Sequence, residues 1–183
     1  MLVMCKEESD FTMNKLNLNR MAEAIFYKGQ DEEVKKFLIE NRFKHYNLRD
    51  KSTPAGKFFY KLTAEQVLEV THSYTKFSVY ESLAQADNYL VLQGEISISE
   101  QFEILASLDD RKGISNRQAM QNPHWTLNPN DLIMRKYSIP GFNKLLDYIC
   151  INELFDVVVE FSMYDVPVGV NQENLLIWEL RSY

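Results

Sequence analysis

The sequence predicts an α+β protein, with short N-terminal helices followed by an antiparallel or mixed sheet against which one or two helices pack. Two observations support this class. Between residues 17 and 87, apolar residues recur at helical spacing next to capping signals. From residue 88 onward, apolar and polar residues alternate over two long segments, which is typical of half-buried strands.

Five segments in the first half of the chain have helical features. Residues 17–29 place Leu18, Met21 and Ile25 on one helical face and end at a glycine. Residues 31–43 begin with three acids, which complement the helix dipole. Residues 53–62 begin with Thr-Pro, and residues 63–74 and 78–87 begin with capping-box spacing. We therefore expect four or five short helices in this part of the chain.

The second half of the chain contains both segments with helical spacing and segments with strand-like alternation. Residues 88–99 and 100–110 read as paired strands, and residues 113–123 as a short helix with a capping box. Asn-Pro dipeptides indicate a loop around Trp125, and residues 139–150 form an amphipathic helix pattern. The last segment, residues 156–182, predicts a three-stranded meander with turns near Asp165–Pro167 and at residues 171–174.

Length and composition predict a single domain over residues 1–183. Within it, residues 1–61 are a candidate helical subdomain and residues 62–183 the sheet-containing core. No apolar run is long enough to cross a bilayer, and the first residues lack the pattern of a signal peptide. Two cysteines fit a reducing compartment. These features predict a cytoplasmic protein that does not associate with membranes.

Charge is distributed unevenly along the chain, whose net charge is −6. Residues 1–61 carry 12 Lys/Arg and 9 Asp/Glu, whereas residues 137–183 carry 2 and 7. Such a dipolar surface affects the choice of partner and the association rate rather than the fold.

The densest basic and aromatic run lies at residues 42–61. Cations neutralise phosphates and aromatic rings stack on bases, so this run has the residue types of an RNA-binding or single-strand-binding module. The competing interpretation is a solvated turn between two helices, which the sequence favours because lysine on an outer helix face is ordinary. The candidate phosphate or nucleic-acid contacts, here and in the later turn at residues 109–117, are Lys44, Arg49, Lys51, Lys57, Arg111 and Arg117.

That later turn joins the end of a strand to the start of a helix. Asp109 and Asp110 are oxygen ligands of the kind that Mg²⁺ prefers, and Arg111 and Arg117 are placed for phosphate. A phosphate-transferring enzyme is one interpretation. A polar turn held by an Asp–Arg pair is the other, and the sequence favours it.

The C-terminal segment contains Asp165, Glu179 and Arg181. This spacing resembles the Asp…Glu-x-Lys arrangement of the restriction-endonuclease-like nucleases, with arginine in place of lysine. The resemblance implies a metal-dependent nuclease in which the carboxylates bind Mg²⁺. Glu160 is placed to share a sheet face with Glu179, although alternation on an exposed face explains both residues equally well.

No catalytic motif stands out, so the sequence favours a binding protein over an enzyme, with no cofactor and no resident metal. We expect an accessory or inhibitory factor that docks on a protein or nucleoprotein through its acidic C-terminal face, with a homodimer as a further option. Its size and acidity also fit a protein encoded on a mobile element. The candidate partner-binding residues are Trp125, Glu160, Asp165 and Glu173.

Overall fold

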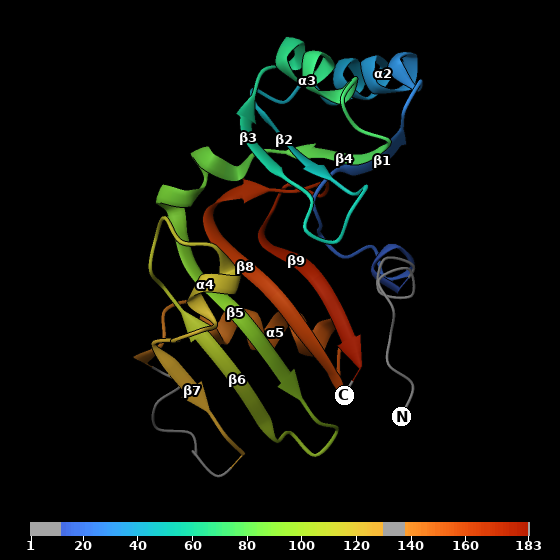
Figure 1. Cartoon of the computed structure of the whole chain (residues 1–183). Helices are drawn as coiled ribbons and strands as arrows, with labels where there is room; N and C mark the ends of the chain where they lie inside the picture. The colour runs from blue at the N-terminus through green and yellow to red at the C-terminus, as the bar shows by residue number, and fades with distance from the viewer. Residues whose placement is uncertain (1–11, 130–137, 183) are drawn as a thin grey trace. The chain divides into compact units, whose positions relative to one another are not determined.

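The structure is a computed structural model, and it describes residues 12–129 and 138–182. The chain divides into two compact units, one formed by Met21–Gln85 and the other by Met1–Arg20 with Ala86–Tyr183. This division does not coincide with the boundary expected at residue 61. Each unit is built on its own antiparallel sheet (Figure 1). The predicted α+β class is confirmed.

The unit formed by Met21–Gln85 has a four-stranded sheet with two helices on one face (Figure 1). Its elements are β1 (Glu23–Tyr27), α2 (Asp31–Asn41), β2 (Tyr46–Asp50), β3 (Phe58–Leu62), α3 (Ala64–Thr71) and β4 (Lys76–Glu81), and the short 3₁₀ helix η1 (Leu83–Gln85) follows. The strands pair in the order β1-β4-β2-β3. Phe26, Leu48 and Val79 project from the strands toward the helices. They belong to the hydrophobic core of this unit, together with buried residues of α2 and α3.

The second unit contains a five-stranded sheet. Its elements are η2 (Asp87–Tyr89), β5 (Leu90–Ile98), β6 (Ile104–Asp109), α4 (Asn116–Ala119), β7 (Trp125–Leu127), α5 (Phe142–Ile151), β8 (Val157–Val168) and β9 (Glu173–Ser182). The strands pair in the order β7-β6-β5-β8-β9, every pair antiparallel. Strands β8 and β9 form one long hairpin (Figure 1).

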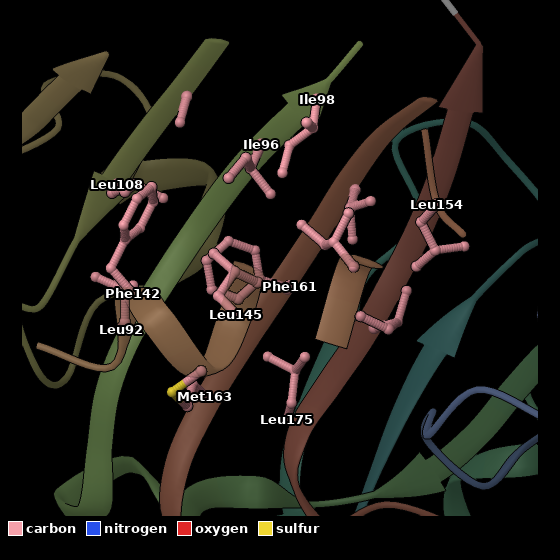
Figure 2. Packing of buried hydrophobic residues seen from close by; sticks show 14 of the residues in the cluster. Leu92, Ile96, Ile98, Leu108, Phe142, Leu145, Leu154, Phe161, Met163 and Leu175 are labelled. Atoms are coloured by element: carbon pink, nitrogen blue, oxygen red, sulfur yellow. The ribbon is translucent and has the colours of Figure 1, made fainter. Parts of the chain in front are cut away.

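Helix α5 covers one face of this sheet. Its buried residues Phe142, Leu145 and Ile149 belong to one cluster with residues such as Leu92 and Phe161 from the strands. Figure 2 shows Phe142 beside Leu92 and Leu145 beside Phe161. Side chains alternate between the faces of a strand, so this packing leaves the polar residues of β5, β8 and β9 on the opposite face.

The side chain of Asn19 forms hydrogen bonds with the turn that joins β8 to β9 and thereby stabilises it. It is fully buried, and its Nδ2 donates to the carbonyl oxygens of Val168 and Leu175, each at 2.8 Å. Its Oδ1 accepts from the backbone N–H of Asn171 at 2.9 Å. One amide side chain therefore satisfies three backbone groups at the turn of the hairpin.

Several predicted elements are confirmed, including α2, α3, α4 and α5 and the paired strands β5 and β6. The capping boxes at Thr63 and Ser115 are both formed. Three of the predicted helices are wrong, because β1, β3 and β4 occupy those segments. The predicted turn at Asp165–Pro167 is also wrong, since these residues lie within β8, and the end of the chain is a two-stranded hairpin.

Over the described part of the chain, no helix combines the length and the apolar character that crossing a membrane would require.

Candidate functional site

The face of the five-stranded sheet opposite α5 carries three glutamates in one row. Glu95 on β5 is the cross-strand partner of Glu160 on β8, and Glu160 is the partner of Glu179 on β9. Directly opposed residues of antiparallel strands share a face, so the three side chains project to the same side. We call Glu95, Glu160 and Glu179 the carboxylate row. Its three strands lie side by side in Figure 1.

Arg181 reaches across this face to Glu95. It lies two residues after Glu179 on β9, opposite Val158, and its Nη2 forms an ion pair with Glu95 Oε1. The side chains of Arg181 and Glu95 are 40% and 36% exposed, although the Nη2 and Nε atoms of Arg181 are themselves buried. The pair offsets part of the negative charge at this end of the carboxylate row, and within the described residues neither Glu160 nor Glu179 has an ion pair with a basic side chain.

Glu160 occupies the centre of the row. Burial raises the pKa of Glu160 above its usual value, and the charges of Glu95 and Glu179 raise it further, while Arg181 acts in the opposite direction. Asn116 of α4 donates from Nδ2 to Glu160 Oε1 at 3.0 Å. The Oδ1 atom of Asn116 is buried and has no hydrogen-bond partner within the described residues.

The structure separates Asp165 from the acids of the row. Asp165 follows Glu160 by five residues on β8 and is exposed, which puts it about 16 Å along the strand from the residue that faces Glu179. Glu173 is exposed at the start of β9. The Asp165, Glu179 and Arg181 arrangement is therefore not assembled, and Glu160 takes the position beside Glu179.

Trp125 is not a free aromatic anchor. It lies in β7, is half-buried and packs against the core that contains α5. Its ring meets that of His124 edge to face, with the ring centroids 5.6 Å apart.

The turn after β6 holds a closed polar cluster. Asp109 is fully buried, and both of its carboxylate oxygens accept from Arg111, the shortest of these bonds being 2.6 Å long. Burial acts to raise the pKa of Asp109, but the hydrogen bonds from Arg111 outweigh it and hold that pKa below its usual value. Asp110 meets His124 Nδ1 at 2.6 Å.

Asp109, Asp110 and His124 place ligand atoms within 4.8 Å of one another, which is a spacing that suits a metal ion. Arg111 already occupies both oxygens of Asp109. The cluster therefore matches the polar turn held by an Asp–Arg pair.

The other candidate phosphate contacts are distributed over both units. Lys44, Arg49, Lys51 and Lys57 belong to the unit Met21–Gln85, whereas Arg117 is exposed on α4 of the other unit. Arg49 lies over the ring of Phe58 at 4.7 Å from its centroid, and the rings of Phe58 and Tyr60 stack with centroids 6.0 Å apart. This exposed aromatic surface is on the sheet face away from α2 and α3.

The sequence matches no protein-family model and no curated protein. The fold, by contrast, is similar to solved structures. One is an N5-carboxyaminoimidazole ribonucleotide synthetase in complex with ADP, with a TM-score of 0.50 and 8% identity over 97% of this chain and 44% of that chain. Another is the D-alanyl-alanine synthetase A from Vibrio cholerae O1 biovar eltor str. N16961, with a TM-score of 0.50 and 8% identity over 98% of this chain and 54% of that one.

The fold of this chain is therefore similar to part of the fold of these two synthetases. The chain spans about half the length of these two structures. The expectation of a small accessory or inhibitory factor that docks on a partner is wrong, because the structures that this fold resembles are synthetases. The acids expected on one docking face are also separated, because Glu160 lies beside Glu179 whereas Asp165 and Glu173 are exposed farther along the β8–β9 hairpin. The nuclease, phosphate-transfer and nucleic-acid-binding alternatives are not supported by this fold either.

Proposed function

We propose that this chain binds a purine nucleotide together with a divalent cation, and that Glu160 and Glu179 hold the cation. The observation that carries the proposal is the carboxylate row on the polar sheet face of a fold similar to a synthetase described as an ADP complex.

The donor set fits a hard cation such as Mg²⁺. Mg²⁺ is usually bound by one or two carboxylates together with the phosphates of a substrate. The two ends of the row, Glu95 and Glu179, are separated by two strand spacings of about 4.8 Å each. Glu160 and Glu179 are cross-strand partners, and one oxygen of Glu95 already pairs with Arg181, so we assign the cation to Glu160 and Glu179. The orphaned Oδ1 of Asn116, whose amide also contacts Glu160, supplies a further buried oxygen beside them.

The electrostatics of Glu160 support the same assignment. Burial and two neighbouring acids raise its pKa, so the ionised form is disfavoured in the protein alone. A divalent cation between Glu160 and Glu179 reverses that balance, because it neutralises the repulsion that raises the pKa. When bound, the cation supplies charge neutralisation for the phosphates of the nucleotide.

Isothermal titration calorimetry with ADP, with and without Mg²⁺, tests the proposal. The wild-type chain is expected to bind ADP more tightly when Mg²⁺ is present, and Glu179→Gln is expected to remove that dependence. Glu103→Gln is the matched control, because Glu103 is exposed in the turn between β5 and β6. Absence of ADP binding at any Mg²⁺ concentration, or an unchanged Mg²⁺ dependence in Glu179→Gln, would contradict the proposal.

A further inference from the structure

A shallow pocket of about 110 Å³ lies on the polar face beside the Glu95 end of the carboxylate row. Five side chains of that face line it, namely Glu95, Ser97, Leu105, Ser107 and Val158. They come from two neighbouring rows of the sheet. Glu95 pairs with Ser107, whereas Ser97 pairs with Leu105 on one side and Val158 on the other.

Ser97 supplies an independent sign of a ligand. It is 4% exposed, and its Oγ has no hydrogen-bond partner among the described residues. An unpaired buried hydroxyl destabilises a folded protein, so each such group calls for an explanation. Ser97 is one of the residues that line the pocket, and a ligand that reaches its hydroxyl would satisfy it.

The polar groups of the pocket favour a cation. Glu95 carries the only formal charge in the lining, and Ser97 and Ser107 contribute hydroxyl oxygens that accept hydrogen bonds. A carboxylate has about four lone-pair sites, and Arg181 occupies Glu95 through one oxygen. Glu160 and Glu179 add negative charge on the same face, so an anion is repelled.

The kind of donor favours an organic ammonium ion. Mg²⁺ is usually bound by one or two carboxylates together with waters and substrate phosphates, whereas this lining offers one carboxylate and two hydroxyls beside two aliphatic side chains. A primary ammonium group has three N–H donors, which matches one carboxylate and two hydroxyls. The aliphatic side chains of Leu105 and Val158 then contact the carbon attached to the nitrogen. The volume of about 110 Å³ is several times what a single water requires, which leaves room for a short alkylammonium.

We propose that this pocket binds the primary ammonium group of a small amine, with Glu95 as the counter-ion and Ser97 and Ser107 as hydrogen-bond acceptors. The inference does not depend on nucleotide binding, because every group that it uses lies in the pocket itself.

The test is an NMR titration of the ¹⁵N-labelled chain with n-propylammonium chloride, without nucleotide or divalent cation. Saturable shifts are expected at the amides of residues 95–97, 105–107 and 158. Tetramethylammonium chloride has no N–H donor and is expected to leave these amides unchanged at the same ionic strength. Shifts that are equal for both salts, or that fall elsewhere, would overturn the proposal.

Two variants separate binding from folding. Glu95→Gln is expected to weaken propylammonium binding about tenfold or more, because hydrogen bonds to charged groups are the strong ones. The matched control is Glu100→Gln, an exposed glutamate after β5 that is expected to bind as the wild type does. Ser97→Ala is expected to weaken binding while its melting temperature stays equal or rises, since it removes an unpaired hydroxyl.

Ser97→Ala also tests whether the Ser97 hydroxyl has a purely structural role. If it lowered the melting temperature and left the affinity for propylammonium unchanged, the hydroxyl would serve the fold and the proposal would fail.

A second titration with Nα-acetyl-lysine methylamide distinguishes the source of the amine. Binding equal to that of propylammonium indicates a lysine side chain of a peptide, whereas binding of propylammonium alone indicates a free amine, and either result supports the pocket. Failure of both ligands would overturn it.

Discussion

Replacing Asn19 by alanine is expected to destabilise the unit that carries the carboxylate row by about 3–5 kcal/mol. The substitution leaves the carbonyls of Val168 and Leu175 and the N–H of Asn171 without their partner, and the site is fully buried. Each buried polar group left unsatisfied costs about 1–3 kcal/mol. Water that enters beside the shortened side chain recovers part of this loss, so the total falls in the lower half of the summed range.

Urea denaturation followed by tryptophan fluorescence measures this effect selectively. Both tryptophans of the chain, Trp125 and Trp178, lie in the same unit as Asn19, so their emission reports unfolding of that unit. Asn143→Ala, at an exposed position of α5, is the matched control and is expected to change the unfolding free energy by less than about 0.5 kcal/mol. A loss of less than about 1 kcal/mol for Asn19→Ala would refute the view that this residue fastens the hairpin.

Three further predictions concern the same sheet and the smaller unit. Burial and neighbouring acids raise the pKa of Glu160 in the folded protein. The free energy of unfolding is therefore expected to fall as pH rises from the ordinary glutamate range through that pKa. Urea titrations at successive pH values measure this fall, and Glu160→Gln should remove it. Gly94 has φ +152°, and a Cβ there would lie 2.1 Å from the carbonyl oxygen of Ser107, so Gly94→Ala should lower the unfolding free energy by at least about 2 kcal/mol. Thr63→Ala removes the capping box of α3 and should destabilise the unit Met21–Gln85 by about 1 kcal/mol in circular-dichroism melts, and an unchanged melt would refute the cap.

Local sequence signals were sufficient where they agreed with the packing. The acidic first turn of α2 and the capping boxes of α3 and α4 mark helices that the structure contains. The signals failed where tertiary pairing outweighed them. Ser78 and Glu81 have capping-box spacing, yet they lie in β4, which pairs with both β1 and β2 and buries Phe77 and Val79.

Strand pairing also explains why the helix predicted over residues 17–29 is wrong. Leu18, Met21 and Ile25 have helical spacing, but β1 pairs with β4 over residues 23–27 and leaves Ile25 50% exposed. A local pattern does not include the partner strand, which lies about 50 residues later in the chain. Similarly, Asp165–Pro167 carries a turn signal inside β8, where the pairing with β9 is irregular between Met163 and Val168 but continues beyond it.

The candidate site was partly visible in the sequence. Glu160 and Glu179 were expected on one sheet face, and the structure makes them cross-strand partners. Glu95 was missed because its place beside Glu160 depends on the strand order, in which β5 pairs with β8 across about 60 residues of chain. The polar alternation of Gln93, Glu95 and Ser97 along β5 was the available signal, but alternation alone does not say which strand is adjacent.

The central claim is that Glu160 and Glu179 hold a divalent cation for a bound nucleotide. The most direct measurement is paramagnetic broadening by trace Mn²⁺ in NMR spectra of the ADP-saturated chain. The amides nearest Glu160 and Glu179 are expected to broaden first, and Glu160→Gln combined with Glu179→Gln should abolish this selectivity. Selective broadening around Asp110 and His124 instead, with no effect near residues 160 and 179, would contradict the account.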